Sequence, residues 1–180
     1  MELHDGQLRR LVPTLTTVRA KELTQALIPA FAEYEINSSA RLCACLAQFA
    51  HETVGFKYMR ELGGPSYFTK YDFREDLGNN AKGMGARYKG RGFIQLTGLF
   101  NYQKASKALD LDLVNFPELV EQLPIAARVS CWWWASHGLN SLADVDGIGS
   151  FKKITKIING GFNGLNSRIR YWTLAKTIWK

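Results

Sequence analysis

The stretch SSARLCACLAQFAHETVGFKYMREL, residues 38–62, places a strongly helical pattern directly before a turn that contains glycine. Ser38 or Ser39 is suited to cap the start of this helix, because a serine side chain accepts a hydrogen bond from a free backbone N–H group. The pattern predicts a helix that ends close to Glu52. Four apolar residues mark its core face at helical spacing: Leu42, Cys45, Leu46 and Phe49.

Two glutamates of this stretch, Glu52 and Glu61, stand nine positions apart. On one continuous helix, nine residues turn through about 900° and rise about 13 Å, so the two side chains would point in opposite directions. Gly55 follows two β-branched residues and is the natural place for the helix to end. A break there would let Glu61 fold back across a cleft from Glu52.

Two carboxyl groups that face each other across a cleft suit the hydrolysis of a glycosidic bond. One must be protonated to release the leaving oxygen, and the other must stay ionised. We expect Glu52, at the end of an apolar helix, to have a raised pKa and to be the acid, and Glu61, in a loop beside Arg60, to be the base. By itself this spacing is weak evidence, because most such pairs are surface acids.

The rest of the chain predicts a mainly α-helical single domain over residues 1–180, with no separate binding module. Residues 55–92 are rich in Gly, Pro, Asn and aromatic residues, which predicts a small lobe of loops or short strands beside the helical lobe. Further helical patterns fall at about 8–13, 18–34, 98–110, 117–123, 124–138, 150–158 and 166–179.

Composition excludes several classes of protein. With 46% hydrophobic and 22% charged residues, the chain is expected to fold rather than to stay disordered. The N-terminus predicts neither a secretory signal nor a membrane anchor. The three histidines lack metal-ligand spacing, so we expect no metal and no cofactor. The cysteines lie in apolar runs and predict reduced core residues in a reducing compartment: Cys43, Cys45 and Cys131.

Positive charge is concentrated at the C-terminal end. The net charge is +7; residues 1–150 hold 16 Lys and Arg against 16 Asp and Glu, whereas residues 151–180 hold seven bases and no acid. Such a segment could meet nucleic acid, an anionic membrane face or an acidic polymer. The alternative is a solvated basic helix face without a partner.

Three more stretches accompany AHETVGF: RYKGRGFIQLTGLFNY (87–102), WWWASHGLNSLAD (132–144) and IINGGFNGLNSRIRYW (157–172). In their order and approximate spacing, the four resemble the pattern of glycoside hydrolase family 19, and the chain looks like a bacteriophage or prophage endolysin of that family. The resemblance implies a lysozyme-like, two-lobed helical fold. It also implies hydrolysis, with inversion, of a β-1,4-linked polymer of N-acetylated amino sugars.

The resemblance also assigns roles to residues. It implies that Glu52 is the general acid and Glu61 the base; plant members have a longer spacing, which would put the base near Glu75. Val54 departs from the glycine that is common in the family at this position. Thr97 would hold the attacking water. The residues implied to bind substrate or to tune the carboxylates are His51, Tyr88, Gln95, Asn101, Asn159 and Arg168.

The expected function is an endolysin that cuts bacterial peptidoglycan. It would wait as a monomer in the host cytoplasm until a holin opens the membrane, and would then act in the periplasm and cell wall. Its basic last thirty residues would face the anionic envelope, and nucleic acid is not an expected partner. Two alternatives remain: a chitinase of the same family, and a non-enzymatic basic protein that binds envelope or nucleic acid.

Overall fold

The computed structural model describes residues 3–180, and within this range the chain is mainly α-helical, as predicted. Only isolated β-bridges occur there, from Arg60 to Arg91 and from Arg91 to Leu96. The α-helices are α1 (Asp5–Leu11), α2 (Thr17–Glu33), α3 (Ser39–Glu52), α4 (Pro65–Phe68), α5 (Met84–Arg87), α6 (Leu99–Leu109), α7 (Leu123–Ser136), α8 (Leu139–Asp144), α9 (Ile148–Asn159) and α10 (Leu165–Ile178). The 3₁₀ helices are η1 (Thr69–Tyr71), η2 (Glu75–Leu77) and η3 (Pro117–Glu121).

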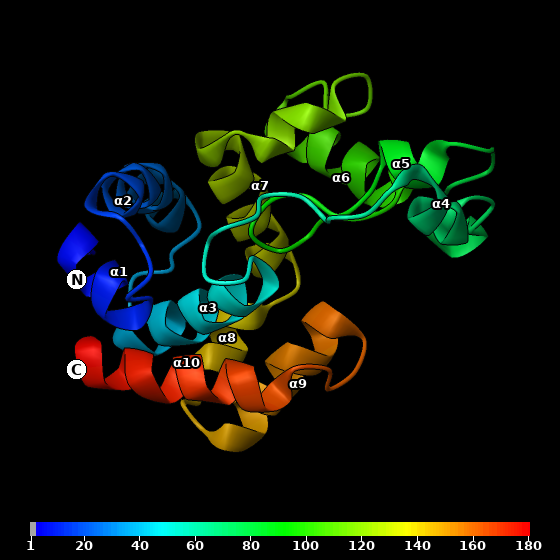
Figure 1. The fold of residues 1–180 in the computed structure, drawn as a ribbon. Coiled ribbons are helices and arrows are strands. Elements are labelled where there is room, and N and C mark those ends of the chain that lie inside the picture. The colour runs from blue at the N-terminus through cyan, green and yellow to red at the C-terminus, as the bar shows by residue number, and fades with distance from the viewer. Residues whose placement is uncertain (1–2) are drawn as a thin grey trace.

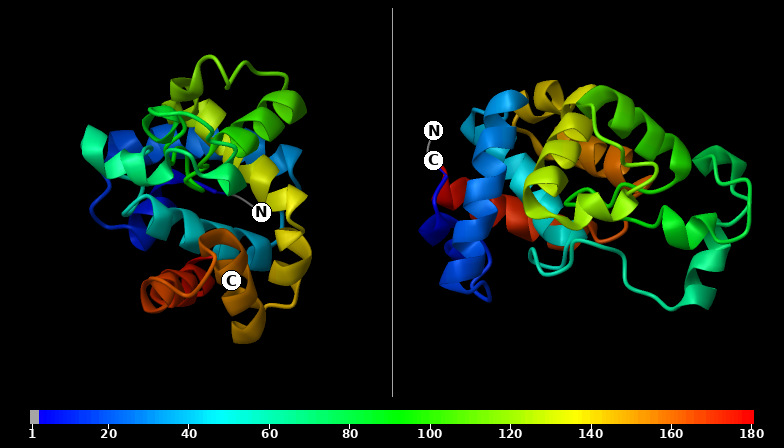
Figure 2. Two further views of the ribbon diagram at one scale, coloured as in Figure 1. Left: turned by 90° about the vertical axis from the view of Figure 1, so that its right-hand side faces the viewer. Right: turned by 90° about the horizontal axis from the view of Figure 1, so that it is seen from above.

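The helices form a body from which an arm projects. The body contains α1, α2, α3 and α7 to α10, and the arm carries α4 and α5 (Figure 1). In the view from above, the arm points away from the end where α1 and the last turn of α10 lie (Figure 2). The segment between α3 and α6 therefore runs from the body out along the arm and back.

Helix α3 is the centre of the body, and its sequence explains why. The Ser38 side chain accepts a hydrogen bond from the backbone N–H of Arg41 at 3.2 Å, so the predicted cap is confirmed. The residues from Leu42 to Ala50 are all buried, which is typical of a helix surrounded by other elements. The ring of Phe49 stacks on Phe93 at 5.5 Å and so joins α3 to the segment before α6.

Helix α10 packs antiparallel against α3. The Ser39 hydroxyl, at the start of α3, donates to the carbonyl oxygen of Trp179, just after the end of α10. At the other end of the pair, His51 and Glu52 contact Ser167 and Arg168 in the first turn of α10. The pairing therefore brings the end of α3 to the start of α10.

The predicted break after Glu52 is confirmed. Helix α3 ends at Glu52, and Val54, Gly55 and Phe56 all have left-handed backbone angles, with φ of +53°, +71° and +61°. The Gly55 N–H donates to the carbonyl oxygen of Ala50 at 2.7 Å, which closes the helix end. The chain therefore reverses between the two glutamates.

The arm differs in part from the prediction of loops and short strands. Four short helices lie within 65–87, namely α4, η1, η2 and α5. Pro65 begins α4 in the position where its missing N–H is harmless. The Asp72 carboxylate accepts hydrogen bonds from the N–H groups of Gly83 and Gly85 at 3.0 and 2.8 Å, which joins η1 to α5. These contacts join residues that are distant in sequence.

Two details of the second half also differ. The pattern PELVEQL forms the 3₁₀ helix η3, and α7 starts at Leu123. Helix α8 was not predicted; Gly138, with φ of +66°, separates it from α7. Within the described part of the chain, no helix combines the length and the hydropathy needed to cross a bilayer.

Candidate active site

Glu52 is held at the end of α3 by a buried arginine. Its carboxylate oxygen Oε1 lies 2.5 Å from Nη2 of Arg168, and the Arg168 side chain is only 1% exposed. Burial raises the pKa of Glu52 above its ordinary value, and the Arg168 charge and hydrogen bond oppose this in part. Glu52 is therefore suited to carry a proton at a pH where an exposed glutamate is ionised.

The position of Arg168 is fixed by a network that the sequence did not reveal. Its Nη1 atom donates to Oε1 of Gln48 at 2.6 Å, and Nε2 of Gln48 donates to the hydroxyl of Thr155 at 2.9 Å. Gln48 and Thr155 are both fully buried. The signal for Gln48 was present as a polar residue inside the apolar run LCACLAQFA, one helical turn before Glu52.

His51 packs against the start of α10 and the glycine that precedes it. Its Nδ1 lies 3.0 Å from the Ser167 hydroxyl, and a Cβ atom on Gly164 would fall 2.2 Å from the ring. Burial, followed by the Arg168 charge, lowers the pKa of His51 to about 4, so the ring is neutral at pH 7. These contacts fix the His51 ring at the start of α10, and its role in substrate binding stays a prediction.

Glu61 lies where the arm joins the body, and its two oxygens have different partners. Oε1 accepts a hydrogen bond from the Tyr71 hydroxyl at 2.9 Å and lies 3.7 Å from Nζ of Lys70. Oε2 accepts from the Gly90 N–H at 3.3 Å. The Glu61 side chain is 19% exposed. By contrast, Glu75 is exposed at the start of η2.

Thr97 lies beside the same glycine. Gly90 is packed so closely that a Cβ atom would lie 2.9 Å from Oε1 of Gln95 and 3.2 Å from the Thr97 hydroxyl oxygen. The Thr97 hydroxyl donates to the Gln95 carbonyl oxygen at 2.9 Å, and Nδ2 of Asn101 donates to the Thr97 carbonyl oxygen at 2.7 Å. Glu61, Gln95 and Thr97 are thus brought together around Gly90, and Asn101 is joined to them through Thr97.

Two more of the residues expected to bind substrate, Tyr88 and Asn159, form hydrogen bonds within the protein. Tyr88 is 4% exposed, and its hydroxyl donates to the Val114 carbonyl oxygen at 3.1 Å; its role in substrate binding stays a prediction. Asn159 is the last residue of α9, and its Oδ1 accepts from the N–H of Asn163 at 3.2 Å. Asn159 therefore shapes the turn that leads to α10.

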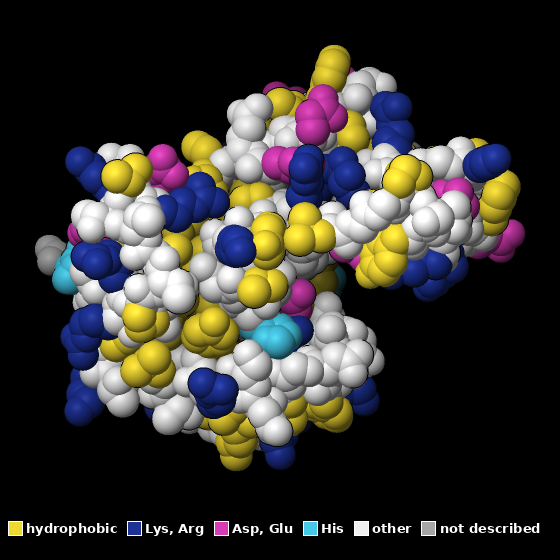
Figure 3. All heavy atoms as spheres, viewed as in Figure 1, with side chains coloured by type: hydrophobic (Ala, Val, Ile, Leu, Met, Phe, Trp, Pro, Cys, Tyr) yellow, Lys and Arg dark blue, Asp and Glu magenta, His cyan; other side chains and the backbone are white. Residues whose placement is uncertain are grey.

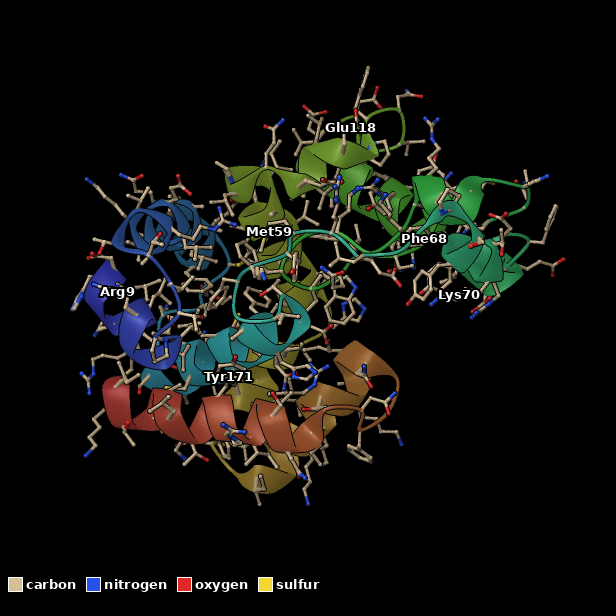
Figure 4. All side chains as sticks on the ribbon, viewed as in Figure 1. Arg9, Met59, Phe68, Lys70, Glu118 and Tyr171 are labelled. Atoms are coloured by element: carbon tan, nitrogen blue, oxygen red, sulfur yellow. The ribbon has the colours of Figure 1, made fainter. Side chains whose placement is uncertain are left out.

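The space-filling view shows a recess between the body and the arm, with an acidic and a histidine side chain visible at its inner end (Figure 3). Phe68 and Lys70 lie in the arm, while Met59 lies in the segment that connects arm and body (Figure 4). Across residues 3–180, no group of His, Cys, Asp and Glu side chains has the arrangement of a metal site. The chemistry available in the recess is that of carboxyl, hydroxyl and amide groups.

A recess with one buried, arginine-bound glutamate and a second glutamate bound to tyrosine and a backbone N–H is suited to acid and base chemistry. The model of the chitinase class I family matches residues 23–143, and the chain belongs to glycoside hydrolase family 19.

Relatives from plants and bacteria agree with this family. The chain is 36% identical to a basic endochitinase of Brassica napus over 140 residues, which is 73% of this chain and 48% of that protein. It is 29% identical over 155 residues to a glycosyl hydrolase family 19 domain-containing protein of Haemophilus influenzae, with 71% and 74% covered. The chain therefore spans about half the length of the plant relative.

The fold also matches a solved structure. Chitinase C of Streptomyces griseus superimposes with a TM-score of 0.73 and 26% identity, over 97% of this chain and 75% of that one. The mainly helical, lysozyme-like architecture expected from the sequence is therefore confirmed.

Proposed function

We propose that the chain is an endolysin that hydrolyses β-1,4 glycosidic bonds of bacterial peptidoglycan with inversion. The observation that carries the proposal is the contrast between the two glutamates. Burial raises the pKa of Glu52, whereas Glu61 accepts hydrogen bonds from Tyr71 and Gly90 and lies near the Lys70 ammonium. One carboxyl group is prepared to give a proton and the other to take one.

In the proposed reaction, Glu52 protonates the glycosidic oxygen while the bond to the anomeric carbon breaks. A water molecule attacks the opposite face of the sugar, and Glu61 removes its proton with the help of the Thr97 hydroxyl. Arg168 stabilises the Glu52 carboxylate that remains. The two carboxyl groups are predicted to lie about 6.5 to 9.5 Å apart, which leaves room for the water.

The mechanism is tested with Glu52→Gln, Glu61→Gln and Glu75→Gln. We expect the first two to lose nearly all activity and the third to keep it, because Glu75 is exposed on the arm. Proton NMR of the first product should show the inverted anomer. A retained anomer, or full lysis by the Glu52 variant, would overturn the mechanism. Loss of lysis with polymer binding intact would also rule out a purely binding protein.

The substrate is tested separately, because the relatives named above include endochitinases. Two features favour peptidoglycan: the resemblance to phage enzymes and the excess of positive charge, since peptidoglycan carries carboxylates and chitin is neutral. Turbidity loss of permeabilised Gram-negative cells is compared with the release of soluble oligomers from colloidal chitin. Cutting of chitin alone would establish the chitinase alternative. Mass spectrometry of the new reducing end then identifies the bond.

The basic C-terminal segment is proposed to contact the anionic envelope. Helix α9 exposes Lys152, Lys153 and Lys156, on a segment without acids. Changing all three to Gln should weaken sedimentation with cell-wall sacculi at low salt and leave cleavage of short soluble glycan unchanged. If the wild type and the triple variant sediment equally at low salt, the basic face of α9 does not bind the cell wall.

The proposal also includes dependence on a holin, which would give the chain access to the cell wall. Expression of the chain inside bacteria should cause lysis only when the inner membrane is permeabilised or a holin is co-expressed. Lysis by the chain alone would contradict the proposed route to the wall. In gel filtration we expect the protein to elute as a monomer.

A further inference from the structure

The two oxygens of the Glu61 carboxylate are not equivalent, and this difference indicates which one takes the proton. Oε1 faces the arm, where it accepts a hydrogen bond from the Tyr71 hydroxyl at 2.9 Å and lies 3.7 Å from the Lys70 ammonium. Oε2 has a single, long contact, the Gly90 N–H at 3.3 Å. Oε1 is thus engaged by the protein, whereas Oε2 keeps lone pairs free for a further donor.

Gly90 places Oε2 on the side of Thr97. The N–H of Gly90 contacts Oε2, and a Cβ atom on the same residue would lie 3.2 Å from the Thr97 hydroxyl oxygen. Gly90 therefore donates to Oε2 of Glu61 and lies next to the Thr97 hydroxyl. We therefore expect a water held by Thr97 to lie on the Oε2 side of the carboxylate.

We propose that Tyr71 is a positioning residue which, with Lys70, anchors Oε1 of Glu61 so that Oε2 is the atom that removes the proton from water. The inference rests on the proposed function of Glu61 as base. As the water oxygen bonds to the anomeric carbon, its proton passes to Oε2 and the glycosidic C–O bond breaks. The leaving oxygen takes the proton of Glu52, so Glu61 ends neutral and Glu52 ends ionised.

The backbone of Tyr71 is fixed well enough for this task. Nδ2 of Asn79 donates to the Tyr71 carbonyl oxygen at 2.9 Å, and Oδ1 of Asn79 accepts from the N–H of Leu99, the first residue of α6, at 3.1 Å. Asn79 is fully buried. Gly85 of α5 packs against Tyr71, since a Cβ atom there would fall 2.9 Å from the Tyr71 Cβ. The arm thus holds the tyrosine from two sides.

Besides the Tyr71 hydroxyl, the Lys70 ammonium lies beside Glu61, and the charge of Lys89 interacts with its carboxylate. Lys70 of η1 lies above the rings of Tyr67 and Tyr71, at 3.5 and 4.6 Å from their centroids. Lys89 precedes Gly90, and Arg60 precedes Glu61. Burial and the hydrogen bond to Glu61 raise the pKa of Tyr71, so its hydroxyl remains a donor at neutral pH. Removing that hydroxyl would leave the cations in place and release only Oε1.

The experiment uses the full chain with Tyr71→Phe, which keeps the ring and removes the hydroxyl. The matched control is Tyr58→Phe, because Tyr58 contacts Lys57 and not Glu61. Steady-state kinetics are measured on peptidoglycan, and on colloidal chitin if the wild type cuts it, from acidic to alkaline pH. For Tyr71→Phe we expect kcat to fall about tenfold, KM to stay unchanged, and the acidic limb of the kcat profile to move to higher pH. The control should match the wild type.

Three results separate the possibilities. An unchanged kcat and acidic limb in Tyr71→Phe, with Glu61→Gln inactive, would overturn this inference alone. A fall in kcat without a shift of the acidic limb, together with a lower Tm, would reduce Tyr71 to a structural residue and overturn it as well. An active Glu61→Gln variant would instead remove the proposed function on which the inference depends.

Discussion

Val54 is a β-branched residue in a left-handed conformation, so Val54→Gly should stabilise the protein. Its φ is +53°, and its side chain is 67% exposed. For an L-residue the left-handed region costs about 1–2 kcal/mol. Glycine avoids this strain but adds about 0.5–1 kcal/mol of backbone entropy to the unfolded chain. Because little apolar contact is lost, the net gain in the free energy of unfolding is about 0.5–1 kcal/mol, or about 1–4 °C in Tm.

Val145 provides a matched control, because it is also 67% exposed but has a right-handed backbone, with φ of −66°. Val145→Gly should lower Tm, since it adds the entropy of glycine without releasing strain. Both variants are measured by thermal and urea unfolding. A Tm for Val54→Gly at or below that of the wild type would refute the strain argument, as would equal shifts in the two variants.

Three further predictions concern the site. Glu52→Gln should stabilise the protein more at pH 7 than at pH 4. The raised pKa of Glu52 means that folding favours its protonated form, so wild-type stability falls as pH rises above the ordinary glutamate pKa. An equal or smaller gain in Tm at pH 7 would contradict this. Gly164→Ala should destabilise by about 2–4 kcal/mol, because φ is +70° and Cβ would overlap His51; wild-type unfolding would refute it. Gly90→Ala should lower kcat about tenfold by displacing Thr97, with cleavage assays as the measurement; an unchanged kcat would show that this packing is unimportant.

The parts of the fold that depend on local signals were predictable. The cap at Ser38, the end of α3 at Glu52 and the left-handed glycine at Gly55 all follow from side chains within a few residues. The short helices of the arm were missed because they depend on contacts such as Asp72 with Gly83, which are eleven residues apart in the sequence. A glycine-rich sequence indicates flexibility in the unfolded chain. It does not show which distant residue will form the contacts that order the segment in the fold.

The site shows the same division. The carboxylates could be proposed from spacing and chemistry, and Arg168 from the resemblance. Gln48 and Tyr71 could not, because each becomes informative only through a partner brought by the fold: Gln48 through Arg168, and Tyr71 through Glu61. A buried glutamine and a half-buried tyrosine look ordinary in a sequence.

The reversal at residues 54–56 is what allows two glutamates nine positions apart to have different chemistry. Had α3 continued, the two side chains would point to opposite faces of one helix, about 13 Å apart along its axis. Instead Glu52 stays with the core helix, where burial raises its pKa and Arg168 holds it. Glu61 passes to the junction with the arm, where Tyr71 and Gly90 donate to it. The proton donor and the proton acceptor are thus differentiated by which part of the fold each side chain joins, and the strained turn at Val54 makes that separation possible within so short a stretch of chain.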